Sequence, residues 1–229
     1  MANKNPPLTT ENRQLTRLVP ADSESEARFK RQPPARDGQT AEVAVAGPRS
    51  MADGASVSGR WLLAIPDTVA AVSGSFRTFT EQHMAAGGLT ELHRESWYGR
   101  DELLTVFARL EAAVGVQIVE RIGRFLPAIL ESPPGVTNLQ AALSAFEDWY
   151  GMWHRESSDT VSFRTVGAAT GELVLATPYP DQFERGLVRG FIYEFGADGE
   201  YARLSGQETD ADGATRYEIT FFGRQPSTD

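Results

Sequence analysis

The segment Tyr179-Pro-Asp-Gln-Phe-Glu-Arg-Gly-Leu-Val-Arg-Gly190 joins two stretches in which apolar and polar residues alternate. Its apolar residues recur at helical spacing and continue to Phe195, which predicts a helix over residues 183–195. Gly186 and Gly190 lie one turn apart in that helix, where each glycine costs about 1 kcal/mol relative to alanine. We therefore expect the glycine face of the helix to press closely against another backbone.

Strand-like alternation flanks this helix on both sides. Residues 160–175 predict one hairpin with its turn at residues 167–171. Residues 200–209 and 214–222 predict a second hairpin. The alternation in the last strand is typical of a sheet with one buried and one solvated face.

Helical periodicity dominates the chain before the first hairpin. Pro66-Asp67 is typical of a first helical turn, and Gly87-Gly88 is expected to end that helix. A second helix start near Gly99 leads into a helical apolar pattern over residues 99–126. Asn138 is placed to cap a further helix that reaches Trp153. Helices thus precede strands, which predicts an α+β fold: an N-terminal helical half packed on a four-stranded antiparallel sheet, with one helix inserted between two hairpins.

The N-terminal part of the chain has a different composition. Residues 1–60 contain six prolines, scattered charges and a single aromatic residue, Phe29. Such a composition cannot bury enough surface to offset the entropy of ordering, so we expect a disordered N-terminal extension. Met51 stands shortly before the first apolar cluster and is a sensible translation start. We expect the folded domain over residues 61–222, followed by a C-terminal tail over residues 223–229.

Charge is distributed unevenly along the chain. Residues 1–60 carry nine basic and seven acidic side chains, whereas residues 61–229 carry 13 basic and 24 acidic ones. An acidic body repels phosphate backbones, so we expect no direct nucleic-acid binding by the folded domain. Lys4 and Lys30 are the only lysines, which fits either coding bias or a protein from a high-salt, halophilic cytoplasm.

Several classes of protein are excluded. The chain has no cysteine, so disulfides, zinc thiolates, iron–sulfur clusters and cysteine nucleophiles are ruled out. No apolar run reaches the roughly 20 residues of a membrane span, and no signal-peptide apolar region is present, so a soluble cytoplasmic protein is expected. Phosphate-binding loops, dinucleotide fingerprints and nucleophile elbows are also missing. The sequence thus predicts no catalytic residue, no metal site and no enzyme activity.

The order of predicted elements around Tyr179–Gly190 resembles a superfamily that joins 4-vinyl-reductase-type domains, haem nitric-oxide-binding (H-NOX) domains and TRAPP trafficking subunits. In these families a helical half packs on a small antiparallel sheet. A Tyr/Pro segment leads into a helix of the form aromatic-x-x-Gly-x-x-x-Gly. The resemblance extends over residues 61–222, and residues 97–127, with Gly115 and Ile122-Gly123, look like the second and third helices of the family. It implies a ligand-binding domain.

The chain departs from the family pattern in two ways. Many 4-vinyl-reductase-type domains hold a metal with cysteines, whereas this chain has Pro180-Asp181 where related segments read Pro-Cys. Haem-binding members use a helix histidine and a Tyr-x-Ser-x-Arg motif, and this motif is missing. His154 is the only candidate axial ligand, and the alternative is a partly exposed histidine that interacts with the dipole at a helix end. We therefore expect no cofactor, with haem as the alternative.

One group of mostly aromatic residues is a candidate ligand pocket between the helices and the sheet. Tryptophan and tyrosine suit a pocket wall because each combines a large apolar face with a polar group. The alternative is ordinary core packing. The candidate pocket residues are Trp97, Tyr98, Trp149, Tyr150, Trp153, His154, Tyr179, Phe183 and Arg185.

Three functions fit these observations. The first is a non-catalytic sensory or regulatory module that binds a small apolar or aromatic ligand, alone or with a regulatory protein partner. The second is a structural or assembly subunit that forms a homodimer through helices, with the Gly186/Gly190 face as the interface. The third is a haem-based gas sensor.

Overall fold

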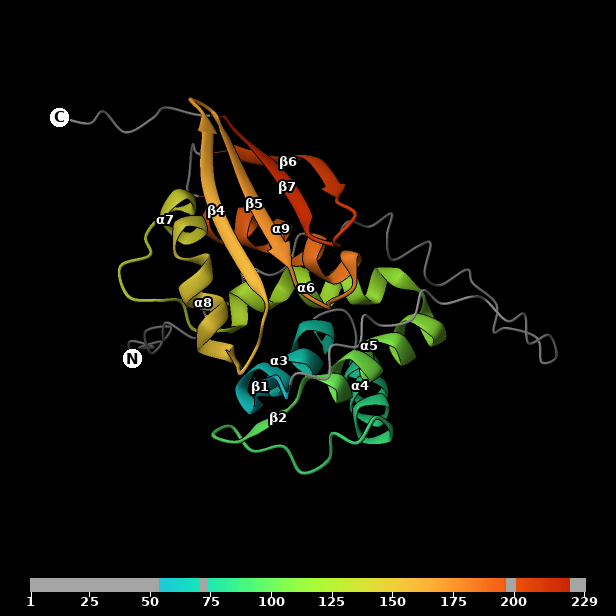
Figure 1. Ribbon diagram of the computed structural model, residues 1–229. Coiled ribbons are helices and arrows are strands. Elements are labelled where there is room, and N and C mark those ends of the chain that lie inside the picture. Colours follow the sequence, from blue (N-terminus) through green and yellow to red (C-terminus); the bar gives the residue numbers. More distant parts are fainter. Residues whose placement is uncertain (1–53, 71–73, 197–200, 223–229) are drawn as a thin grey trace, which may run out of the picture. The chain divides into compact units, whose positions relative to one another are not determined.

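The computed structural model describes residues 54–70, 74–196 and 201–222 of the chain (Figure 1). The protein has an α+β fold with two antiparallel sheets. The helices within the described ranges are α3 (Gly59–Ala70), α4 (Gly74–Ala86), α5 (Arg100–Val114), α6 (Val116–Ile129), α7 (Leu139–Ser144), α8 (Phe146–Trp153) and α9 (Asp181–Phe195). The strands are β1 (Ser56–Ser58), β2 (Trp97–Gly99), β3 (His154–Arg155), β4 (Thr160–Gly167), β5 (Thr170–Ala176), β6 (Tyr201–Thr209) and β7 (Thr215–Phe222).

The larger sheet has the strand order β4-β5-β7-β6, and α9 connects β5 to β6. Neighbouring strands are antiparallel, and Leu173 of β5 pairs with Tyr217 of β7. Alternate residues of these two central strands are buried, as expected for a sheet with one covered face. Helix α9 packs against β6 and β7 (Figure 1), so the segment that begins near Tyr179 helps to cover the sheet.

Helices α6 and α9 are in direct backbone contact. A Cβ atom added to Gly186 would overlap the carbonyl oxygen of Glu120, and one added to Gly190 would overlap the carbonyl oxygen of Arg124. Gly123 of α6 makes the reciprocal approach to the backbone of α9. The predicted close approach of the glycine face is therefore confirmed. The proposed use of this face as a homodimer interface is wrong, because α6 of the same chain covers it.

The smaller sheet has the strand order β2-β1-β3. Val57 of β1 pairs with Tyr98 on one side and with His154 on the other. Strand β1 and the start of α3 fall within residues 1–60, so the prediction of disorder is wrong for this part. The reason is that β1 is held by two strands that lie far away in the sequence. Residues 1–53 and the predicted C-terminal tail lie outside the described residues.

The helices differ from the predicted ones at two points. Pro66, expected in a first turn, lies inside α3, because the apolar cluster before it is itself helical and buried. Asn138 caps α7 as predicted, since its Oδ1 accepts a hydrogen bond from the Ala141 amide at 2.9 Å. The helix that follows was expected to be continuous, but a turn at Ala145 separates α7 from α8.

One hydrophobic core joins the helices to the larger sheet. Its largest side chains are aromatic and come from α3, α5, α8, α9 and β7. They are Trp61, Phe107, Phe146, Trp149, Phe183, Phe191 and Tyr217. In the parts of the chain that the structure describes, no helix is both long and apolar enough to cross a membrane.

Candidate functional site

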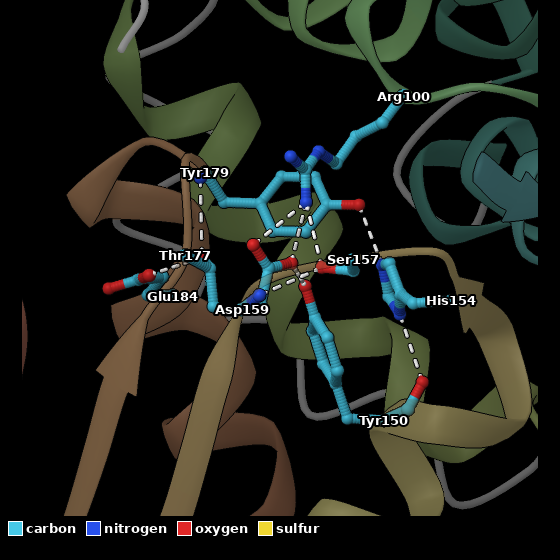
Figure 2. A network of polar contacts seen from close by, with 8 residues as sticks. All are labelled: Arg100, Tyr150, His154, Ser157, Asp159, Thr177, Tyr179 and Glu184. Atoms are coloured by element: carbon cyan, nitrogen blue, oxygen red, sulfur yellow. Dashed lines mark hydrogen bonds and ion pairs between the residues drawn. The ribbon is translucent and has the colours of Figure 1, made fainter. Parts of the chain in front are cut away.

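His154 lies where α8 ends and β3 begins, and its side chain is only 6% exposed (Figure 2). Its Nδ1 lies 3.0 Å from the carbonyl oxygen of Tyr150. Because a carbonyl oxygen only accepts hydrogen bonds, Nδ1 carries the proton and Nε2 acts as an acceptor. The Tyr179 hydroxyl donates to Nε2 at 2.7 Å. The expectation of a partly exposed histidine is wrong, because pairing of β3 with β1 carries the ring into the interior.

Both partners of this hydrogen bond are uncharged at neutral pH. Burial lowers the pKa of His154 to about 4; the Arg100 guanidinium also lowers it, and the Tyr150 carbonyl and the Asp159 carboxylate oppose the shift. Burial raises the pKa of the Tyr179 phenol well above its ordinary value. The contact is therefore a neutral hydrogen bond with a defined direction, from the phenol to the imidazole.

A buried ion pair lies beside this contact. Arg100 Nη1 lies 2.8 Å and 2.7 Å from the two carboxylate oxygens of Asp159, and the two side chains are 2% and 4% exposed. The Tyr150 hydroxyl donates to the same carboxylate at 2.5 Å, and Ser157 Oγ accepts from Arg100 at 3.0 Å. Burial, together with Tyr179 and Asp159, raises the pKa of the Tyr150 phenol well above its ordinary value. The carboxylate thus has the charge-assisted hydrogen bonds that a buried charge needs.

Aromatic rings enclose the histidine and the tyrosine. The ring of Tyr150 is stacked on that of His154, with centroids 3.8 Å apart and 4° between the planes. Trp61 meets the imidazole edge-on, with centroids 4.9 Å apart. Phe183 lies 5.0 Å from the Tyr179 ring, centroid to centroid. Apart from the ion pair, the surroundings of the hydrogen bond are therefore apolar.

A second polar network anchors the start of α9. Thr177 Oγ1 donates to Glu184 Oε1 at 2.6 Å, and the Tyr217 hydroxyl donates to Oε2 at 3.1 Å. Burial and the Glu184 carboxylate raise the pKa of the Tyr217 phenol. Since Tyr179 lies between Thr177 and α9, the short connection from β5 to α9 is held by both networks (Figure 2).

Part of the predicted pocket set forms one cluster. Trp149 is connected to the cluster through Trp61, because the ring centroids of Trp149 and Trp61 lie 5.4 Å apart and Trp61 also contacts His154. The members of the cluster are Trp149, Tyr150, His154, Tyr179 and Phe183.

The other predicted residues lie elsewhere. Trp97 and Tyr98 are on β2 in the smaller sheet. Arg185 of α9 forms an ion pair with Glu120 of α6 at 3.2 Å. Trp153 is buried at the end of α8. A role in a ligand pocket stays a prediction for these residues, as it does for the cluster.

Sequence reasoning missed four residues of the site: Trp61, Arg100, Asp159 and Glu184. Arg100 and Asp159 lie 59 positions apart, so no local pattern connects them. A signal for Glu184 was available, because it shares a helix face with Val188 inside the predicted apolar stripe. An acid in such a position is expected to be buried and to need hydrogen-bond donors.

Three buried indole groups have no hydrogen-bond acceptor among the described residues. They are the Nε1–H groups of Trp61, Trp149 and Trp153. A buried donor without a partner costs about 1–3 kcal/mol, so such groups are uncommon in a core. Two of the three belong to rings in contact, since Trp61 and Trp149 lie side by side.

No protein-family profile and no curated protein matches the chain. Solved structures of H-NOX domains share its fold. An H-NOX protein from S. oneidensis in the Fe(II)NO state is 12% identical, with a TM-score of 0.57 over 72% of this chain and 99% of that chain. An oxygen-binding H-NOX domain related to soluble guanylate cyclases, in its oxygen complex, is 14% identical, with a TM-score of 0.52 over 75% of this chain and 95% of that chain.

A third structure, from work on modulating heme redox potential through protein-induced porphyrin distortion, is 14% identical, with a TM-score of 0.53 over 75% of this chain and 97% of that chain. At these identities the comparisons show a shared fold. The H-NOX part of the predicted resemblance is confirmed at that level, and the 4-vinyl-reductase and TRAPP parts stay predictions. The expectation of no cofactor is contradicted, because these structures of the same fold concern heme, oxygen and Fe(II)NO states.

The residues around His154 do not fit a haem in the conformation described. Nδ1 donates to the Tyr150 carbonyl and Nε2 accepts from Tyr179, so both ring nitrogens are engaged. Trp61 and Phe183, whose rings border this site, are completely buried. Iron coordination at His154 requires that Tyr179 first leaves Nε2.

Proposed function

We propose that the folded domain is a sensory module that binds a small molecule in its aromatic interior and does not catalyse a reaction. The fold shared with H-NOX structures supports this proposal, because those structures are described in complexes with oxygen or NO. The absence of catalysis is supported by the pairing of the buried charges, since Asp159 and Glu184 each accept hydrogen bonds from the protein itself. Haem is included among the ligands to test, since one related structure concerns heme, and its binding at His154 would require Tyr179 to leave Nε2.

The unsatisfied indole groups carry the proposal of a ligand. Trp61 and Trp149 each hold a buried donor that finds no acceptor in the described ranges, although their rings are packed against other aromatic rings. A flat molecule with an apolar body and a hydrogen-bond acceptor would satisfy such donors and keep the aromatic contacts. This is the class of ligand that the interior supports.

The hydrogen bond between His154 and Tyr179 gives such a module a route for its signal. His154 belongs to the α8–β3 junction, and Tyr179 belongs to the connection from β5 to α9. Trp61 touches both the imidazole and Trp149. A molecule accepted beside Trp61 therefore displaces rings that border this hydrogen bond, and the change reaches α9. We propose that the signal passes either to a second copy of the chain in a homodimer or to a regulatory protein.

Thermal unfolding in the presence of haem and of a panel of small aromatic compounds tests the proposal. A ligand at about one hundred times its dissociation constant stabilises the folded state by about 2.7 kcal/mol, which raises the melting temperature measurably. We expect at least one compound to do so in the wild-type chain. A panel that includes haem and produces no shift contradicts the proposal.

Two tryptophan variants locate the site. Trp149→Phe keeps an aromatic ring but removes one unsatisfied indole donor, so we expect the ligand-induced shift to decrease. Trp97→Phe is the matched control, because Trp97 lies on β2 outside the cluster. An equal loss of the shift in both variants would argue against a site at the cluster. For haem, a Soret band that persists in His154→Gln shows that His154 does not bind the iron.

A further inference from the structure

Tyr179 and His154 are arranged for the transfer of a proton. The phenol donates to Nε2 over 2.7 Å, and the Tyr150 carbonyl fixes the tautomer that leaves Nε2 unprotonated (Figure 2). A base at this distance is within reach of the proton that it would accept. The imidazole is uncharged before the transfer, so it has room for a proton on Nε2.

We propose that Tyr179 is a redox-active tyrosine and that His154 is its proton acceptor. Loss of one electron makes a phenol O–H group strongly acidic, so electron loss and proton transfer occur together when a base is in contact. The electron passes to an outer-sphere one-electron oxidant, the O–H bond of Tyr179 breaks, and an N–H bond forms at Nε2 of His154. The products are a neutral tyrosyl radical and an imidazolium, and return of one electron from a reductant reverses both transfers.

The site accommodates the imidazolium that forms. Nδ1–H keeps its hydrogen bond to the carbonyl of Tyr150, and the Tyr150 ring lies stacked 3.8 Å from the imidazole, where a cation is attracted by the aromatic face. The charged groups nearby oppose each other, since the Asp159 carboxylate favours the imidazolium and the Arg100 guanidinium disfavours it. A phenol radical cation is a much stronger acid than an imidazolium even in this environment, so the proton transfer runs towards His154.

Burial protects the radical. Tyr179 is only 4% exposed, and its ring is flanked by Phe183 at 5.0 Å and by Phe107 at 6.1 Å, centroid to centroid. Water and dissolved reductants therefore have little access to the phenolic oxygen. A radical formed here is expected to live longer than one on an exposed tyrosine.

The acceptor distinguishes Tyr179 from the other buried tyrosines. Tyr150 donates to Asp159, whose two carboxylate oxygens also accept from a guanidinium. Tyr217 donates to Glu184, which also accepts from a threonine hydroxyl. Tyr179 alone among these three faces an imidazole nitrogen.

Flash photolysis of the full chain with tris(bipyridine)ruthenium and an electron acceptor tests the inference. The photogenerated ruthenium(III) is the oxidant, and tyrosyl radicals are followed by optical absorption and by electron paramagnetic resonance. In the wild-type chain we expect a long-lived tyrosyl radical whose formation is slower in D₂O. We expect Tyr179→Phe to lose most of this signal and His154→Gln to shorten its lifetime at least about tenfold, as for loss of a positioned base.

Tyr98→Phe is the matched control. Its hydroxyl donates to the carbonyl oxygen of Glu91, which takes up no proton, so the long-lived signal should be unchanged. Equal radical signals in the wild type and in Tyr179→Phe overturn the inference. So does the absence of a D₂O effect in the wild type, a result that needs no variant to fold. The pair acts without a bound ligand, so a failed ligand screen leaves this inference standing and a failed radical experiment leaves the sensory proposal standing.

Discussion

His154 makes the stability of the domain depend on pH. Its pKa is about 6.5 in an unfolded chain and about 4 in the fold. As the pH falls below about 6.5, the unfolded state takes up a proton that the folded state does not, so the free energy of unfolding decreases. This contribution is complete above about pH 6.5 and is lost towards pH 4, by an amount on the order of 3 kcal/mol.

Urea unfolding near neutral pH and near pH 5 measures this contribution. We expect the free energy of unfolding to fall less between the two pH values in His154→Gln than in the wild type. His93→Gln is the control, since His93 is exposed and should leave the wild-type pH dependence intact. If the pH dependence of His154→Gln equals that of the wild type, the buried neutral imidazole is not the cause.

The buried ion pair of Arg100 and Asp159 gives a second prediction, which concerns its contribution to stability. Asp159→Asn leaves the Arg100 guanidinium buried without its carboxylate, which typically costs about 3–5 kcal/mol. Arg164→Gln breaks the exposed pair with Glu172 and should cost less than about 1 kcal/mol. Chemical denaturation of both variants compares the two costs. Similar small losses would mean that the buried pair contributes no more than a surface pair.

The contact between α6 and α9 gives a prediction for whole elements. Gly186→Ala places a methyl group on the carbonyl oxygen of Glu120, so the two helices must move apart, at a cost of about 1–3 kcal/mol or more. Gly151→Ala is the matched control, because Gly151 lies in α8 with no atom near the added methyl group. There the better helix propensity of alanine should raise stability by up to about 1 kcal/mol. We therefore expect the melting temperature to fall in Gly186→Ala and to rise in Gly151→Ala. Equal changes in the two variants would contradict the close packing of α6 and α9.

Elements with strong local patterns could be predicted from the sequence. The helix over residues 183–195 could be predicted because its apolar residues have a helical period. The observed helix, Asp181–Phe195, begins two residues earlier and ends at the same residue. Asn138 was identified as a cap from its chemistry alone. Strand β1 was missed because Ser56–Ser58, with only three residues, is too short for its alternation to be recognised, and it becomes a strand only through pairing with β2 and β3.

The candidate site could be predicted less completely, because its partners are distant in the sequence. Aromatic residues marked the neighbourhood of His154, and Tyr179 was included in the candidate set. The contact between them depends on the meeting of the α8–β3 junction with the connection from β5 to α9, which no periodicity encodes. The same holds for Arg100 and Asp159, which lie 59 positions apart and meet only in the fold.

At the scale of the whole molecule, two truncations test where the stable unit begins. Removing residues 1–50 keeps all described contacts, including the hydrogen bond from the Arg100 amide to the Ala55 carbonyl at 3.0 Å. We expect the melting temperature to stay within about 2 °C of that of the full chain. A chain that begins at Trp61 lacks β1, so the pairs of Val57 with both neighbouring strands are lost.

The shorter chain should melt at least about 5 °C lower, since the loss of central-strand pairing exceeds 1 kcal/mol. Circular dichroism during heating measures both truncations under the same conditions. If the two truncated chains melt at the same temperature, β1 does not contribute to the stability of the domain.

The glycine contact also has a mechanical consequence. Side chains between two helices normally form a compliant layer that absorbs small displacements, but at Gly123, Gly186 and Gly190 main-chain atoms of one helix meet the other helix directly. We therefore expect a shift of α9 to move α6 by nearly the same distance. Helix α6 follows α5 after a single glycine, Gly115, and packs against it, so we expect a displacement of the start of α9 to reach α5 through α6.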